Sequence, residues 1–359
     1  MIVTGSNGKT TVKGMIQSIF ESAVGIDKAL ATQGNFNNEI GLPLTLLRLD
    51  MNHELAVIEL GMNHPGETAF LANIAKPTIA LINNAQREHQ EFMETVDAVA
   101  KEHALAIKAL PENGVAVYPA DSEYSAYWKK ISDQRTVVDF AFNQKATVWG
   151  EWLDQANGQI MIHTPQSDIK VMLQILGDHN ACNAVAASAV AIAAGISPAM
   201  IQVGLESFLP VNGRMQKHSL NNDITVIDDS YNANPDSVRA AIDVLSNIKT
   251  AAWLVLGDMG EVGNQGPEFH REVGHYAGEK GIQKLFALGD LSKEAVAAYQ
   301  ASATQGNVAQ HFADVAELCT ELNKSLNARK NHEEVTLLVK GSRFMRMERV
   351  VKALAEEMH

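Results

Sequence analysis

A short glycine-containing segment near the start of the chain constrains the fold more than any other feature. Its sequence is Gly5-Ser6-Asn7-Gly8-Lys9-Thr10-Thr11, and it follows the apolar pair Ile2-Val3. The residues after it, Val12, Met15, Ile16, Ile19 and Phe20, have the spacing of one helix face. A strand that leads through a glycine-containing turn into a helix is the context of a phosphate-binding loop. The segment therefore predicts an α/β domain that binds a nucleotide.

Each residue type in this segment suits that chemistry. Glycines let the backbone curl so that its N–H groups point at phosphate oxygens. Lys9 adds a positive charge for the β and γ phosphates, and the hydroxyl of Thr10 can bind Mg²⁺. The common form of the motif has glycine where this chain has Val3. The alternative interpretation is a glycine-rich turn that only caps a helix.

The rest of the chain predicts a largely parallel sheet with helices between its strands. Short apolar runs at 55–60, 78–82 and 115–117 alternate with longer helical patterns. Residues 137–175 alternate in strand fashion and predict a small β subregion, and an alanine-rich helix is expected at about 179–194.

A second domain is expected after the connecting segment 209–213. Strand-like runs resume at 224–227, 253–256, 285–288 and 335–339, and 359 residues are enough for two cores. We therefore predict domains at 1–212 and 213–359.

Charge and composition exclude several classes of partner. The chain has 42 acidic and 29 basic side chains, a net charge of -13, which disfavours binding to nucleic acid or to an anionic membrane surface. No apolar run reaches the about 18 residues of a membrane span. Cys182 and Cys319 lack the spacing of a disulfide framework or a zinc site. We expect a cytoplasmic protein that does not insert into membranes.

Three further stretches make the interpretation specific. They are Thr32-Gln33-Gly34-Asn35-Phe36-Asn37-Asn38-Glu39-Ile40-Gly41-Leu42-Pro43, Val57-Ile58-Glu59-Leu60-Gly61-Met62-Asn63 and Asp228-Asp229-Ser230-Tyr231-Asn232-Ala233-Asn234-Pro235. With the first loop and the late Val339-Lys340-Gly341-Ser342-Arg343, they resemble the Mur ligase family, over the whole chain and in the same order. The resemblance implies a central ATPase-like domain with a phosphate loop, followed by a Rossmann-like domain.

The resemblance also implies a reaction. ATP and Mg²⁺ would be the cofactors, and UDP-N-acetylmuramoyl-tripeptide and D-alanyl-D-alanine would be joined through an acyl phosphate, by a protein expected to be a monomer. Family members carry a further domain before the phosphate loop, whereas only residues 1–4 precede it here, so this chain is expected to lack the N-terminal substrate domain. The alternatives are a related ligase that glutamylates folates, and a nucleotide-binding module without turnover.

The expected catalytic residues are Lys9, Glu59 and His89. Glu59 ends an apolar run, where an ionised carboxylate is costly unless a cation, an ion pair or a helix terminus compensates it. The resemblance makes Thr10, Glu59 and His89 ligands of Mg²⁺, although a lone loop histidine is often only a polar surface residue. In the family a lysine about fourteen residues after this histidine is often carbamylated, and here that position is His103. We predict that His103 faces the nucleotide and holds water or Mg²⁺; otherwise it fills a polar gap.

The remaining expected contacts come from the resemblance. His179, Asn180 and Asn183 would contact the adenine, unless Asn180 only caps a helix. Arg214 and Asp229 match positions near the γ-phosphate and the ribose. Asn35 and Asn38 match a substrate-facing loop, and the last group, Lys340, Ser342 and Arg343, lies where a strand meets the final helix. The planar fork of Arg343 suits the carboxylate of the dipeptide, or it is a solvated charge.

Overall fold

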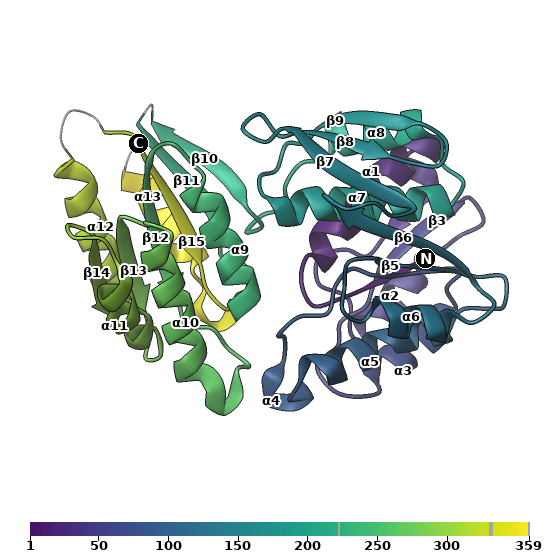
Figure 1. Ribbon diagram of the computed structural model, residues 1–359, viewed down its shortest axis with the longest axis horizontal. Coiled ribbons are helices and arrows are strands. Elements are labelled where there is room, and N and C mark those ends of the chain that lie inside the picture. The colour runs from purple at the N-terminus through teal and green to yellow at the C-terminus, as the bar shows by residue number, and fades with distance from the viewer. Residues whose placement is uncertain (222, 330–332, 358–359) are drawn as a thin grey trace. The chain divides into compact units, whose positions relative to one another are not determined.

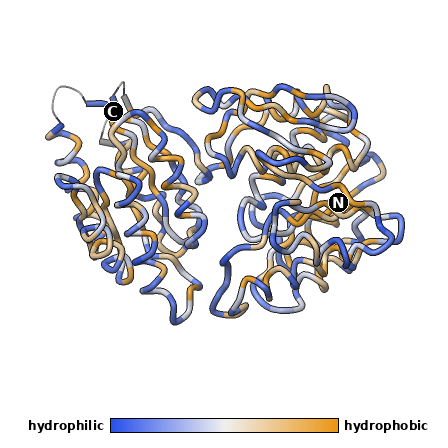
Figure 2. The backbone as a smooth tube through the Cα atoms, viewed as in Figure 1, coloured by the Kyte–Doolittle hydropathy of each residue, from blue (hydrophilic) through white to orange (hydrophobic). Residues whose placement is uncertain are grey.

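The chain forms two compact units, each with its own sheet. The computed structural model describes residues 1–221, 223–329 and 333–357. The first unit is Met1–Leu209 and the second is Pro210–His359 (Figure 1). In both, hydrophobic stretches follow the central strands and hydrophilic stretches follow the loops and outer helix faces (Figure 2).

The first unit is built on a nine-stranded sheet with the order β2-β3-β1-β4-β5-β6-β7-β8-β9. The strands are β1 (Ile2–Thr4), β2 (Ala29–Ala31), β3 (Leu55–Glu59), β4 (Ile79–Ile82), β5 (Val115–Pro119), β6 (Thr136–Phe142), β7 (Val148–Asp154), β8 (Gln159–His163) and β9 (Asp168–Met172). All pairs from β2 to β7 are parallel, and β8 pairs antiparallel with both β7 and β9. The short first strand β1 therefore lies inside the sheet, between β3 and β4.

Helices cover both faces of this sheet. One core contains apolar side chains of β1, β3, β4 and β5 together with side chains of α2 (Gly41–Leu46), α3 (Glu67–Ala75), α5 (Val96–Lys108) and α6 (Ser125–Ser132). The helices α1 (Lys9–Val24), α7 (Asp178–Ala193) and α8 (Pro198–Ser207) pack together and against the sheet. The alanine-rich sequence of α7 lets it lie close to the strands, and most of its side chains are buried. A short helix, α4 (Gln90–Met93), precedes α5.

The second unit has a six-stranded sheet with the order β10-β11-β15-β12-β13-β14. Its strands are β10 (Gln216–Asn221), β11 (Ile224–Asp229), β12 (Ala251–Gly257), β13 (Lys284–Leu288), β14 (Val308–Phe312) and β15 (Val335–Lys340). All pairs are parallel except that of β10 with β11. The late strand β15 therefore lies in the middle of the sheet, between β11 and β12.

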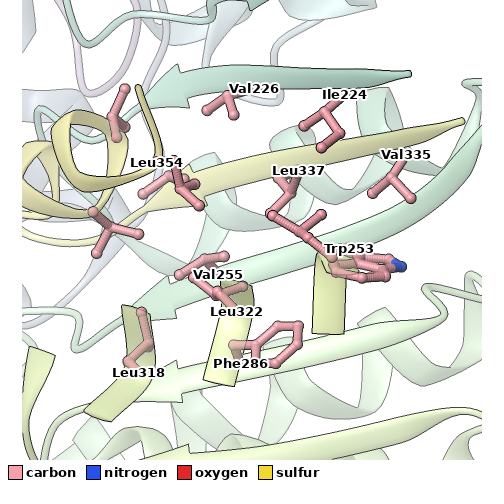
Figure 3. Close-up of a cluster of buried hydrophobic side chains, with 14 of the residues drawn as sticks. Ile224, Val226, Trp253, Val255, Phe286, Leu318, Leu322, Val335, Leu337 and Leu354 are labelled. Carbon is pink, nitrogen blue, oxygen red and sulfur yellow. The ribbon is translucent and has the colours of Figure 1, made fainter. Parts of the chain in front are cut away.

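Alternate residues of these strands build the core of the second unit. One face packs against α12 (Val315–Asn327) and α13 (Glu348–Glu357). Figure 3 shows side chains of this face: Ile224 and Val226 of β11, Val335 and Leu337 of β15, Trp253 and Val255 of β12, and Phe286 of β13. The helices α9 (Pro235–Ser246) and α11 (Ser292–Ser302) also pack on the sheet, and α10 (Gly266–Glu279) packs between them.

The expected fold class, a large mostly parallel sheet followed by a second α/β unit, is confirmed. The four strand-like runs of the second unit are the strands β11, β12, β13 and β15. The β subregion expected at 137–175 is present as β6 to β9, and it continues the main sheet instead of forming a separate one. Among the described helices, none combines the length and the apolar character that crossing a membrane requires.

Candidate nucleotide site

The strand order brings three segments to one edge of the first sheet. β1 lies between β3 and β4 and is parallel to both, so the residues at their carboxyl ends lie side by side. Thr4 ends β1, Glu59 ends β3, and Asn83 follows β4. From β1 the chain continues to β2 and β3 on one side of it, and from β3 it crosses over to β4 on the other side. The carboxyl end of β1 is therefore a topological switch point, the place where α/β sheets bind ligands.

The glycine-containing loop crosses this edge in a conformation that only glycine adopts easily. Gly5 has φ 138° and Gly8 has φ 78°, and α1 begins directly after Gly8. A Cβ on Gly8 would lie 2.6 Å from Oδ1 of Asn183, and one on Gly5 would lie 2.9 Å from Cβ of Asn83. The loop is therefore packed tightly against the residues after β4 and the start of α7.

The segment after β4 fixes the loop by hydrogen bonds. The backbone N–H of Asn7 donates to Oδ1 of Asn84 (2.8 Å), and that of Ser6 donates to the Asn84 carbonyl (3.2 Å). Nδ2 of Asn83 donates both to the Asn7 carbonyl (2.8 Å) and to Oδ1 of Asn183 (2.9 Å). These hydrogen bonds within the protein fix the conformation of the loop.

The ammonium group of Lys9 is turned toward the loop and a carboxylate. Nζ donates to the carbonyls of Gly5 and Ser6, and it forms an ion pair of 3.3 Å with Oε2 of Glu88. The side chain of Glu88 is only 5% exposed. Burial raises the pKa of this carboxyl group, but attraction to Lys9 and the hydrogen bond and charge of His103, with a contribution from His89, lower it to about 2. Glu88 is therefore an anion next to the glycine-containing loop.

Glu59 and Thr10 form a second polar cluster at the same edge. Oε1 of Glu59 accepts from Oγ1 of Thr10 (3.3 Å) and from Nδ2 of Asn37 (2.9 Å). Its other oxygen, Oε2, is buried and has no hydrogen-bond partner among the described residues. A buried carboxylate oxygen without a partner is costly, and a cation would compensate it. The pair of Thr10 and Glu59 therefore fits the oxygen ligands that Mg²⁺ prefers.

The two predicted histidines differ in their surroundings. His89 precedes α4 in a left-handed conformation with φ 47°, and its Nε2 lies 3.8 Å from Oε2 of Glu88. His103 lies on α5 and is completely buried. Its Nδ1 is 2.9 Å from Oγ1 of Thr4, and its Nε2 is 2.9 Å from Oε1 of Glu88. Both ring nitrogens of His103 thus have protein partners. In this geometry His103 holds the carboxylate of Glu88, which differs from the predicted role of His103 as a metal ligand.

The predicted adenine-contacting residues lie at the start of α7. Asn180 is inside the helix, so it is not the cap residue, and its Nδ2 donates to the Leu176 carbonyl (2.8 Å) and lies 2.9 Å from Nε2 of His179. Asn183 is buried and connects this group to Asn83. Their position next to Gly8 suits a nucleotide whose phosphates lie in the loop.

The predicted substrate loop is largely exposed. Asn35 lies in the turn before α2, where its carbonyl accepts from the backbone N–H of Asn37 (2.8 Å). Oδ1 of Asn38 accepts from the N–H of Gly41 (2.8 Å). Asn37, which lies between them, is the residue of this stretch that contacts Glu59.

Five predicted residues of the second unit gather around the ends of β11 and β15. Nζ of Lys340 donates to Oδ2 of Asp229 (2.6 Å) and to the Asn232 carbonyl (2.9 Å), in a buried pair. Oγ of Ser342 donates to the Ala233 carbonyl (3.0 Å) and accepts from the N–H of Gly260 (2.6 Å). These contacts tie the end of β15 to the loop after β11.

The two arginines of this group lie over one aromatic ring. The guanidinium carbon of Arg214 is 4.1 Å from the ring centroid of Tyr231, and that of Arg343 is 6.0 Å from it. Arg343 also pairs with Glu348 (3.0 Å) and is 57% exposed. Its planar fork is thus available to an anion in solution.

Some residues of the first-unit site were not predicted. Asn37, Asn83, Asn84 and Glu88 each contact the loop or its partners. Asn37 lies within the quoted stretch 32–43 but was given no role, and the other three belong to none of the quoted motifs. An acidic residue next to His89, after a predicted strand, is the one signal that could have pointed to Glu88. The complete group can bind a polyphosphate through Lys9 and the loop and a divalent cation through Thr10 and Glu59, which is the chemistry of phosphoryl transfer.

Two domains of known protein families match most of the chain. The Mur ligase middle domain matches residues 3–191. The glutamate ligase domain of Mur ligases matches residues 213–343.

Individual relatives agree with these matches. The UDP-N-acetylmuramoyl-tripeptide--D-alanyl-D-alanine ligases of Escherichia coli and of Buchnera aphidicola from Baizongia pistaciae are 38% and 35% identical to this chain. Each match covers 99% of this chain and 76% or 75% of the relative. A crystal structure of MurF from Acinetobacter baumannii superposes with a TM-score of 0.91 at 31% identity, covering 99% of this chain and 76% of that one. The chain belongs to the Mur ligase family.

Proposed function

We propose that this protein joins D-alanyl-D-alanine to UDP-N-acetylmuramoyl-tripeptide with hydrolysis of ATP to ADP and phosphate, in the cytoplasm. The observation that carries the proposal is the cluster of Lys9, Thr10 and Glu59 at the switch point of the first sheet. The names of relatives that match this chain over 99% of its length support the choice of substrates.

The residues of the first unit have separate tasks in this proposal. Lys9 exchanges its contacts with loop carbonyls for the β and γ phosphates. Thr10 and Glu59 hold Mg²⁺, with His89 as a further ligand. When it is bound, Mg²⁺ neutralises negative charge on the phosphates so that a second anion can approach. His179, Asn180 and Asn183 contact the adenine.

The proposed reaction has two steps. An oxygen of the tripeptide carboxylate forms a bond to the γ-phosphorus while the bond to the bridging oxygen breaks, so ADP leaves and an acyl phosphate remains. The dipeptide amine then attacks the acyl carbon, phosphate leaves with the bonding electron pair, and the amine gives up a proton. The first step brings two anions together, the carboxylate and the γ-phosphate, so neutralisation of charge and positioning by the loop supply much of the catalysis.

The second unit contributes binding groups in this proposal. Arg343 takes the terminal carboxylate of the dipeptide, because a guanidinium fork binds two carboxylate oxygens. Lys340 and Ser342 fix the backbone that carries Arg343. Arg214 and Asp229 contact the γ-phosphate and the ribose, and Asn35 and Asn38 of the first unit face the substrate.

The loop assignment can be tested with Lys9→Ala. Loss of the ammonium group should weaken binding of MgATP at least about tenfold, since a charge-assisted contact contributes about 1.5–3 kcal/mol. Titration calorimetry measures the affinity, and circular dichroism checks the fold. Lys170→Ala, at an exposed position of β9, is the matched control and should bind as the wild type does. Equal affinity of the Lys9 variant and the wild type would remove the loop from the proposal.

The substrates are tested by phosphate release from ATP. Release should require both UDP-N-acetylmuramoyl-tripeptide and D-alanyl-D-alanine and should not occur with a folate and glutamate. Release with the folate pair alone would favour the folate-type ligase. Tight binding of MgATP without release under any condition would favour a nucleotide-binding module.

A further inference from the structure

The buried carboxylate of Glu88 has no task in the reaction described above. It lies in the segment between β4 and α4, beside the phosphate loop, and one of its oxygens faces the Lys9 ammonium at 3.3 Å. An isolated buried carboxylate is strongly unfavourable, so its surroundings must compensate the charge.

A fixed chain of contacts holds Glu88 from behind. Thr4 ends the central strand β1, and its hydroxyl contacts Nδ1 of His103. Because an ionised carboxylate can only accept, Nε2 of His103 donates to Oε1 of Glu88. The hydroxyl of Thr4 holds the other ring nitrogen, Nδ1, at 2.9 Å. One carboxylate oxygen is therefore occupied by His103, and the other is directed at the loop.

This position places a fixed negative charge where nucleotide phosphates must arrive. Lys9 contacts Glu88 and the carbonyls of Gly5 and Ser6, so a phosphate has to compete with the carboxylate for the ammonium. Glu59, next to Thr10, adds a second buried carboxylate at the same sheet edge. Charges of like sign repel strongly in such a poorly solvated place, and a divalent cation that accompanies the phosphates would offset the repulsion.

We infer that Glu88, fixed by His103, is a positioning residue that makes the phosphate loop select the nucleotide together with its divalent cation over the free polyanion. The carboxylate holds Lys9 in place while the loop is empty. It then disfavours ATP that arrives without Mg²⁺. His103 acts through Glu88, by fixing the direction of the carboxylate. This inference rests on the proposed binding of ATP to the loop.

The test compares two affinities of the full chain for a non-hydrolysable ATP analogue, one in Mg²⁺ and one in EDTA, by titration calorimetry. The wild type should bind more tightly in Mg²⁺. Glu88→Gln keeps the shape and removes the charge, and it should reduce the ratio of the two affinities about tenfold. AMP, which lacks the β and γ phosphates, should bind equally to both proteins. Glu91→Gln, at an exposed position on α4, is the matched control and should keep the wild-type ratio.

Which of the two affinities changes in Glu88→Gln shows how the charge acts. Tighter binding in EDTA means that the carboxylate repels the phosphates, whereas weaker binding in Mg²⁺ means that it attracts the cation, and both support the inference. Glu88→Asp, which keeps the charge, should keep a preference for the Mg²⁺ complex. Glu88→Ala replaces the glutamine variant if melting curves show that the latter does not fold.

A double-mutant cycle tests the part played by His103. His103→Asn should reduce the ratio in the wild-type background and have no further effect in the Glu88→Gln background. Equal effects in both backgrounds would overturn the role of His103. A wild-type ratio in the Glu88→Gln protein would overturn the inference and leave the proposed function intact, whereas a wild type that does not bind MgATP would overturn both.

Discussion

The hydroxyl of Tyr299 is a buried polar group on α11 in the second unit. The side chain is fully buried, and its hydroxyl donates to the Ile282 carbonyl. Burial raises the pKa of Tyr299 to about 12. Nδ2 of Asn307 donates to the same carbonyl (3.2 Å), so this acceptor keeps a partner if the hydroxyl is removed.

Tyr299→Phe should therefore lower the free energy of unfolding by about 1 kcal/mol at pH 8, the net value of one hydrogen bond. A tyrosine whose pKa is higher in the folded state stabilises the protein below its unfolded pKa of 10.0, and this contribution is lost as the pH rises toward 12. The difference in the free energy of unfolding between the wild type and Tyr299→Phe, measured by urea titrations, should therefore narrow as the pH rises from 10 to 12. Tyr127→Phe, at a partly buried position, is the control. A difference that stays constant up to pH 12 would contradict the assignment.

At the scale of single residues, the sequence indicated those members of the candidate site that belong to motifs. Lys9 and Thr10 lie in the glycine-containing loop. Glu59 ends an apolar run, and the family resemblance implies that it is a Mg²⁺ ligand. Glu88 was missed because its contacts with Lys9 and His103 are created by the strand order, which brings residues from β1, α1 and α5 together. The partners of a side chain in the fold are not visible in its neighbours along the sequence.

The contact between α10 and α11 depends on one glycine. A Cβ on Gly274 would lie 2.1 Å from the Ala295 carbonyl oxygen, which is backbone and cannot rotate away. Two effects compete in Gly274→Ala: alanine favours a helix by about 1 kcal/mol, and overpacking costs about 1–3 kcal/mol or more.

At this distance we expect overpacking to exceed the gain, so Gly274→Ala should lower the free energy of unfolding by about 2 kcal/mol. Urea denaturation followed by circular dichroism measures the change. Glu279→Ala, an exposed position of the same helix, should change stability by less than about 0.5 kcal/mol. A Gly274 variant that is more stable than the wild type would mean that the two helices separate at little cost.

At the scale of elements, the sequence of the second unit predicted the strands that lie inside its sheet and missed the two at its edges. β11, β12, β13 and β15 are buried and read as apolar runs. β10 and β14 are the two outer strands of the second sheet. Polar residues interrupt the apolar pattern in both of them, because their sequences are Gln-Lys-His-Ser-Leu-Asn and Val-Ala-Gln-His-Phe.

At the scale of the whole molecule, each unit has its own hydrophobic core, and destabilisation of one should be observed locally. The clusters of the first and second units share no residue. Amide exchange followed by mass spectrometry should show faster exchange in β12 and β13 of the Gly274→Ala protein, with β1 and β4 unchanged. Equal acceleration in both units would show instead that they unfold as one cooperative block.

The central position of β15 has a consequence for how the second unit is made on the ribosome. β11 and β12 are synthesised before β15 (residues 335–340), the strand that pairs with both of them, so their facing edges have no partner until that segment emerges (Figure 1). Unpaired, apolar strand edges are sites where nascent chains aggregate. The second unit therefore completes its sheet late in translation, and the interval before β15 arrives is when its strand edges are most exposed to aggregation.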